Sequence, residues 1–194
     1  MDAIASTKRA VLQATTVLSL VVWTKVFATN LGLGGAKNTA GTRAPEDTYQ
    51  TKPTTDEEEG GGPSEEAQQN QERAQRIVNN DLENIPYTMV LAWGAAYCIT
   101  ASGSRRVPAY GLAHIVLYSV FVVCRIAHSI AYAKKIATAR SLLWLVGALC
   151  SFGIAINGTI ASFDLDFVYW RHWVTECHQE EEEEDNNNWT TKSK

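Results

Sequence analysis

The fold is decided by residues 141–163, which read SLLWLVGALCSFGIAINGTIASF and contain no charged side chain. An α-helix needs about 20 consecutive apolar residues to cross the ~30 Å hydrocarbon core of a bilayer. This stretch meets that requirement, so it predicts a membrane-spanning helix. Further apolar runs of similar length lie at residues 10–31, 85–102 and 107–133. The sequence therefore predicts an all-α fold, with a bundle of four transmembrane helices within residues 1–163.

The run at residues 10–31 also has the apolar character of a secretory signal peptide. It is longer than an ordinary signal core, and the later runs would hold the chain in the membrane in either case. We therefore interpret it as the first span, with Lys25 extending its amine toward the membrane surface. Asn157, deep in the fourth run, is interpreted as a hydrogen-bonding residue between helices.

Charged residues are concentrated outside these runs, so the mean hydropathy of the whole chain is only −0.15. Residues 48–71 combine acidic side chains with prolines and glycines, and we expect a flexible acidic loop there. Residues 164–194 are expected to form an amphipathic and then acidic tail that is disordered at its end. The net charge of −4 gives no reason to expect a nucleic acid partner. The cysteines lack the spacing of a disulfide framework or a metal site.

One helical face of the third run carries polar groups at membrane depth. Arg125, His128 and Tyr132 follow one another at i, i+3 and i+7, so a helix places all of them on one side. A charged side chain at the bilayer centre is costly, about 2.5–3.5 kcal/mol for arginine, and it usually faces a bundle interior or a wet cavity. We therefore expect this face to form one wall of a polar site.

A second polar stripe leads into the second run. Its members step by three and four residues along the predicted helix, and they are Arg73, Arg76, Asn80, Glu83 and Tyr87. Considered alone, this stripe is equally consistent with a solvated helix face. Antiparallel packing of the second and third helices would bring both stripes to the same depth. Arg140 and Ser141, at the start of the fourth run, would lie on that same side.

Together these groups predict a binding site for a small polyanion. The four arginines carry more charge than Glu83 could neutralise, whereas a purely structural network would balance its charges. A guanidinium group can bind a carboxylate through two hydrogen bonds, and Glu83 could pair with an amine. Glutathione has this chemistry, with two carboxylates, one ammonium group and one thiol. Many other anions have it too.

Several segments of this sequence together resemble the MAPEG superfamily of membrane glutathione enzymes. They are Pro45-Glu46-Asp47, Glu72-Arg73-Ala74-Gln75-Arg76, Asn80-Asp81-Leu82-Glu83-Asn84-Ile85 and Arg125-Ile126-Ala127-His128-Ser129-Ile130-Ala131-Tyr132. The resemblance extends over about residues 10–161, and it points to the branch of microsomal glutathione transferase and microsomal prostaglandin E synthase. It implies a homotrimer with twelve spans in the endoplasmic reticulum membrane, or also in the mitochondrial outer membrane. Glutathione would bind between neighbouring subunits.

The resemblance also implies which residues act. Those that would bind glutathione or shape its pocket are Arg73, Arg76, Asn80, Glu83, Arg125, His128 and Tyr132. Arg140 and Ser141 match the segment beside the glutathione sulfur. The chemistry needs a thiolate, which a nearby guanidinium or hydroxyl group stabilises. Arg140 is therefore the first candidate for the catalytic residue and Ser141 the second.

We expect a membrane-bound glutathione S-transferase or peroxidase that acts on lipophilic electrophiles or lipid hydroperoxides. Two alternatives stay open: a glutathione-dependent prostaglandin E synthase, and a non-catalytic lipid-binding or scaffold protein with the same fold. The motifs divide between the enzymes, because Arg140-Ser141 is more similar to the synthase and Asn80-Asp81-Leu82-Glu83-Asn84-Ile85 to the transferase. Thr48 replaces the modifiable cysteine of the transferase, so activation by thiol modification is not expected there.

Overall fold

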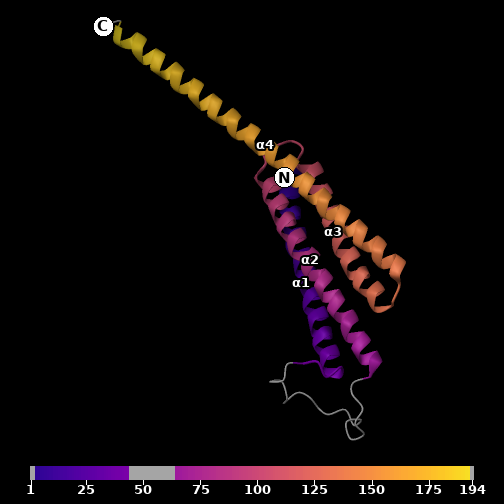
Figure 1. Cartoon of the computed structure of the whole chain (residues 1–194). Coiled ribbons are helices and arrows are strands. Elements are labelled where there is room, and N and C mark those ends of the chain that lie inside the picture. Colours follow the sequence, from indigo (N-terminus) through magenta and orange to yellow (C-terminus); the bar gives the residue numbers. More distant parts are fainter. Residues whose placement is uncertain (1–2, 44–63, 193–194) are drawn as a thin grey trace.

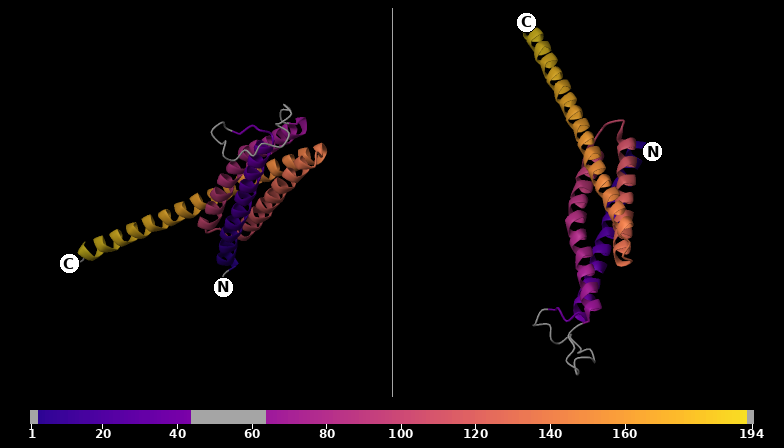
Figure 2. Two further views of the ribbon diagram at one scale, coloured as in Figure 1. Left: turned by 90° about the horizontal axis from the view of Figure 1, so that it is seen from below. Right: turned by 45° about the vertical axis from the view of Figure 1, so that its right-hand side comes forward.

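The computed structural model describes residues 3–43 and 64–192, with side chains up to residue 164. These ranges form the helices α1 (Ala3–Thr39), α2 (Glu65–Ala101), α3 (Val107–Ala133) and α4 (Ala137–Lys192), and they contain no strand. The helices run alternately up and down in one bundle, and α4 continues far beyond it (Figures 1 and 2). The predicted all-α fold is confirmed.

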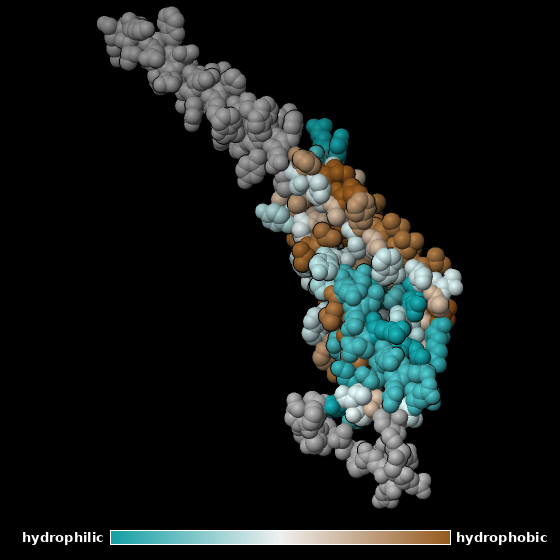
Figure 3. All heavy atoms as spheres, in the orientation of Figure 1, coloured by the Kyte–Doolittle hydropathy of each residue, from teal (hydrophilic) through white to brown (hydrophobic). Residues whose placement is uncertain are grey.

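Three of the helices are long and apolar enough to cross a membrane, namely α1, α3 and the Ala137–Asp164 part of α4. The remaining helix, α2, is not among these candidate spans; its first half is polar, and its second half covers residues 85–101 of the predicted span at 85–102. Large apolar side chains cover much of the bundle surface, and Val90 is 73% exposed. Figure 3 shows such a surface along the upper part of the bundle and a hydrophilic surface at its lower end. The bundle thus has the exterior of a multi-pass membrane protein.

The start of α2 corrects the predicted extent of the acidic loop. We expected the loop to continue to residue 71, but α2 begins at Glu65. Ser64 caps the helix, because its hydroxyl accepts a hydrogen bond of 3.3 Å from the amide of Ala67. Glu65 and Glu66 occupy the first turn, where the helix dipole favours negative charge. The rest of the predicted loop, residues 48–63, lies outside the described ranges.

The end of α4 also differs from the expectation of a disordered tail. The helix continues without interruption to Lys192. No glycine or proline occurs between Asp164 and Lys192, and the glutamates of this stretch are good helix formers. The tail sequence therefore contains nothing that would end the helix near the bundle.

The first helix is an integral part of the bundle. Val22 of α1 is buried in the central apolar cluster together with Tyr118, Phe121 and Ile154. A removable signal peptide would not contribute to the core in this way. The packing favours the interpretation of residues 10–31 as a span.

Polar side chains connect the helices inside this apolar core. Thr15 of α1 and His114 of α3 are hydrogen-bonded at 2.9 Å. The side-chain amide of Asn157 donates a hydrogen bond of 3.0 Å to the carbonyl oxygen of Tyr110. This contact joins α4 to α3 and confirms that Asn157 is an interhelical hydrogen-bonding residue.

A close approach of α2 and α4 depends on a glycine. A methyl group at Gly158 would lie 2.7 Å from the Ala95 Cβ and 2.9 Å from the Ala95 Cα. We expect Gly158→Ala to push the two helices apart and to lower stability by about 1–3 kcal/mol. Thermal unfolding of the detergent-solubilised protein measures this loss. Gly94→Ala is the matched control, because nothing lies within 4 Å of its added methyl group.

Candidate functional site

Arg125 lies at the bottom of the candidate site and is only 1% exposed. Its Nη1 donates a hydrogen bond of 3.0 Å to Asn80 Oδ1 on α2, and its Nη2 donates one of 3.3 Å to the carbonyl oxygen of Trp144 on α4. The guanidinium carbon also lies 5.4 Å from the centre of the Phe121 ring. Gly147 makes room for this group, because a methyl group there would lie 2.6 Å from Nη2. Arg125 therefore ties together α2, α3 and α4.

One and two helical turns further along α3, His128 and Tyr132 continue the polar face. Their ring centres lie 5.7 Å apart, and His128 is buried whereas Tyr132 is half-buried. Arg140, in the first turn of α4, places its guanidinium carbon 4.6 Å from the centre of the Tyr132 ring. This cation–π contact holds Arg140 over the end of α3. The predicted candidates of α3 and α4 are thus brought together.

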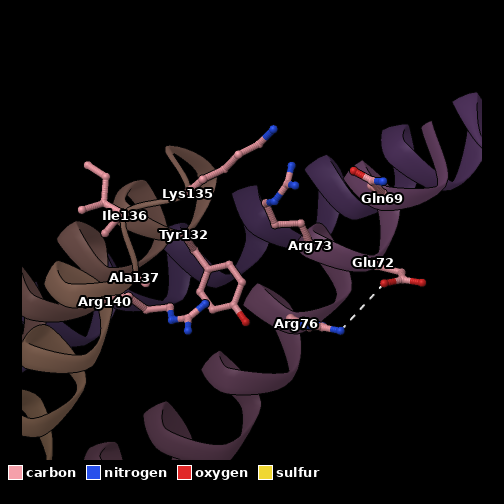
Figure 4. A pocket seen from close by; sticks show the side chains of 10 residues that line it. Gln69, Glu72, Arg73, Arg76, Tyr132, Lys135, Ile136, Ala137 and Arg140 are labelled. Atoms are coloured by element: carbon pink, nitrogen blue, oxygen red, sulfur yellow. Dashed lines mark ion pairs between the residues drawn. The ribbon is translucent and has the colours of Figure 1, made fainter. Parts of the chain in front are cut away.

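Two pockets open beside this stack. The outer pocket has a volume of about 310 Å³ and is lined by Gln69, Glu72, Arg73, Arg76, Ala131, Tyr132, Lys135, Ile136, Ala137 and Arg140. Figure 4 shows these side chains, which come from α2, from α4 and from the end of α3 and its turn. The inner pocket, further along the same helices, has a volume of about 270 Å³ and is lined by Asn80, His128, Tyr132, Arg140, Ser141 and Trp144. Tyr132 and Arg140 belong to both pockets.

Positive charge predominates in the outer pocket. Its cationic residues are Arg73, Arg76, Lys135 and Arg140, and its acidic residue is Glu72. Glu72 pairs with Arg76 at 3.8 Å. Arg73 donates a hydrogen bond of 2.8 Å to the amide oxygen of Asn70. Within residues 3–43 and 64–164, the other cations of the pocket have no acidic partner, so the pocket is suited to an anion.

Next to the site, a buried ion pair joins α1 to α2. The amine of Lys25 contacts the carboxylate of Asp81, which is 1% exposed. Thr29 donates a further hydrogen bond of 3.1 Å to the same carboxylate. The prediction that Lys25 extends to the membrane surface is therefore wrong, because a buried carboxylate lies within its reach. Lys25 in an apolar run and Asp81 beside Asn80 were the signals that could have revealed this pair.

The second polar stripe divides where it enters the bundle. Asp81, Ile85 and Thr88 are buried, so they define the inward face of α2. Glu83 and Tyr87 lie on another face, where both are exposed and line neither pocket. A single chain therefore does not bring Glu83 together with the other predicted binding residues. The sequence pattern did not single out the remaining lining residues, which are Gln69, Glu72, Ala131, Lys135, Ile136, Ala137 and Trp144.

Breaking the buried ion pair should destabilise the bundle. Asp81→Leu leaves the amine of Lys25 without its partner at a site where its side chain is 10% exposed. We expect a loss of about 3–5 kcal/mol in unfolding free energy, measured by thermal or denaturant unfolding in detergent. The double variant Lys25→Met/Asp81→Leu should recover most of that loss. A single variant as stable as the wild type would show that the pair does not hold α1 to α2.

Comparison with protein families yields one match. The model of the MAPEG family matches residues 11–159, which contain α2 and α3, parts of α1 and α4, and all the lining residues of both pockets. No curated protein matches the chain.

Proposed function

The chain belongs to the MAPEG family, which includes glutathione transferases and prostaglandin E synthases, and on this basis we propose a glutathione-dependent transferase or peroxidase of the membrane. One observation carries the proposal. The cationic outer pocket and the inner pocket meet at Arg140, which is placed over the ring of Tyr132. The first pocket suits a polyanion, and the second lies further into the bundle, where a lipophilic substrate would be dissolved.

The outer pocket supports binding of the carboxylates of glutathione. Arg73 and Arg76 of α2 offer guanidinium groups, which bind carboxylates through paired hydrogen bonds. Glu72 in the same pocket could receive the ammonium group, the role that we expected of Glu83. The thiol would then extend toward the inner pocket, past Tyr132. Asn80 and His128 would shape that end, with Arg125 fixing Asn80 from behind.

Arg140 is the better candidate for activating the thiol. A free thiol has a pKa of about 8.5, so a nearby positive charge increases the thiolate fraction at neutral pH. The hydroxyl of Ser141 donates a hydrogen bond of 3.2 Å to the carbonyl oxygen of Ala137 and would have to give it up. The guanidinium group of Arg140 has no hydrogen-bond partner among the described residues, so its donors are available.

The thiolate can react with lipophilic substrates in two ways. Attack on an electrophilic carbon forms a carbon–sulfur bond while the leaving group departs with its electron pair. Attack on a peroxide oxygen breaks the oxygen–oxygen bond and gives an alcohol and a sulfenic acid, which a second glutathione reduces to the disulfide with release of water. Both outcomes need the same activated sulfur, so one site could serve both activities.

Prostaglandin E synthase activity is the second candidate. It is favoured by Arg140 and Ser141 lying side by side in the wall of the inner pocket. A parallel assay with an aryl halide and with a prostaglandin endoperoxide separates the two enzymes. Preferential turnover of the endoperoxide would replace the transferase assignment.

A homotrimer with twelve spans in the endoplasmic reticulum membrane completes the proposal. Glu83 and Tyr87 are exposed in the single chain, and Tyr87 is 71% exposed. In a trimer these side chains would be available to the site of a neighbouring subunit. Calorimetry on the intact trimer tests the proposal directly, and the absence of glutathione binding there would overturn it.

Replacing Arg140 should separate binding from turnover. We expect Arg140→Ala to change the dissociation constant of glutathione by less than about threefold, because other cations of the outer pocket remain. Turnover should fall at least tenfold, about 1.4 kcal/mol in the barrier, because the thiolate loses its stabilising charge. Calorimetry and an aryl halide assay measure the two quantities.

Arg105→Ala is the control for Arg140→Ala, since it removes an exposed arginine from the connection between α2 and α3. Figure 1 shows this connection at the end of the bundle opposite the turn between α3 and α4. This variant should behave as the wild type does. An equal loss of binding and turnover in Arg140→Ala would instead assign Arg140 to glutathione binding.

A further inference from the structure

The turn between α3 and α4 contains an unusual backbone conformation. Lys135 has a φ of 63°, and it is the one non-glycine residue of the described ranges with a positive φ. Its backbone amide donates a hydrogen bond of 3.2 Å to the carbonyl oxygen of Tyr132. The backbone amide of Ile136 donates one of 2.9 Å to the carbonyl oxygen of Ala131. These hydrogen bonds form a Schellman motif, in which Lys135 occupies the left-handed position.

A lysine is unexpected at this position. Glycine adopts the left-handed conformation without penalty, whereas a residue with a Cβ atom does so at a cost. The side chain of Lys135 is exposed, so burial in the core does not offset that cost. The helix dipole of α3 does not require it either, because Lys134 already supplies a cation at the C-terminus of the helix. Neither burial nor the helix dipole therefore accounts for a lysine at this position.

The surroundings of the side chain indicate its role. Lys135 lines the outer pocket, where Arg73 lies across from it on α2. Figure 4 shows the amine of Lys135 extending from the turn on the side where the guanidinium of Arg73 lies. Two cations that converge without an acid between them repel each other in the empty pocket, and a bound carboxylate would relieve that repulsion.

We propose that Lys135 is a carboxylate-binding residue of the outer pocket, placed there by a turn whose backbone favours glycine. This inference rests on the proposed function, since the carboxylate would be one of the two of glutathione. It adds a residue outside the helical stripes to the binding site. It also predicts that a glycine at position 135 would make the protein more stable but weaken its binding of glutathione.

Three substitutions at this position separate charge from backbone strain. Lys135→Gly removes both, so the midpoint of thermal unfolding should rise by about 1–3 °C while the dissociation constant of glutathione rises about fivefold. Lys135→Gln removes only the charge, so its affinity for glutathione should fall as much as that of Lys135→Gly, while its midpoint of thermal unfolding should not rise. Lys135→Arg keeps both and should stay within twofold of wild-type affinity. Calorimetry and thermal unfolding of the detergent-solubilised protein measure these quantities.

Lys134→Gln is the matched control, because Lys134 precedes Lys135, is also exposed and does not line the pocket. Its affinity for glutathione should stay within twofold of the wild type. The inference is overturned if Lys135→Gln binds as the wild type does, or if Lys134→Gln loses as much affinity. The inference is also overturned if the midpoint of thermal unfolding falls by several degrees in Lys135→Gly, because the lysine side chain would then stabilise the fold. If the wild type binds no glutathione, the proposed function fails first and the inference fails with it.

Discussion

A buried guanidinium group sets the arrangement of three helices. Arg125 is removed from water, so its nitrogen atoms need partners within the protein. Asn80 and the Trp144 carbonyl provide partners for Nη1 and Nη2 from the two neighbouring helices, whereas Nε has none among the described residues. Gly147 leaves the space that the guanidinium group requires. Any rotation of α2 or α4 would break one of these contacts. Arg125 thereby holds in place two residues that line the inner pocket, Asn80 and Trp144.

Burial separates the polar groups that hold the bundle from those that face the pockets. The pairs Lys25–Asp81 and Thr15–His114 connect helices deep inside, where an unpaired group would be costly. The polar side chains around the pockets are more accessible, and several of them have no partner of opposite charge in the described part of the chain. Charges that remain unpaired at a pocket are available to a ligand. Polar residues thus stabilise the bundle where they are buried and are available to bind a ligand where they line the pockets.

Periodicity was sufficient to predict the helices of the bundle and part of the lining of the pockets, because residues three or four positions apart share one face. It could not predict Lys25–Asp81, since that pair depends on how two helices are rotated against each other. The same rotation turns Asp81 and Ile85 inward and leaves Glu83 exposed. Lys135 was missed because a turn has no period, and only the backbone shows its left-handed conformation.

The stacked pair of Tyr132 and Arg140 forms a partition between two compartments. A molecule that displaces Arg140 from one side changes the shape and charge offered on the other. Thermodynamic linkage requires the effect to be mutual, so each occupant alters the affinity for its neighbour by the same factor. An occupant of one pocket that moves Arg140 would therefore bind cooperatively with the occupant of the other, whereas occupants that leave Arg140 in place would bind independently.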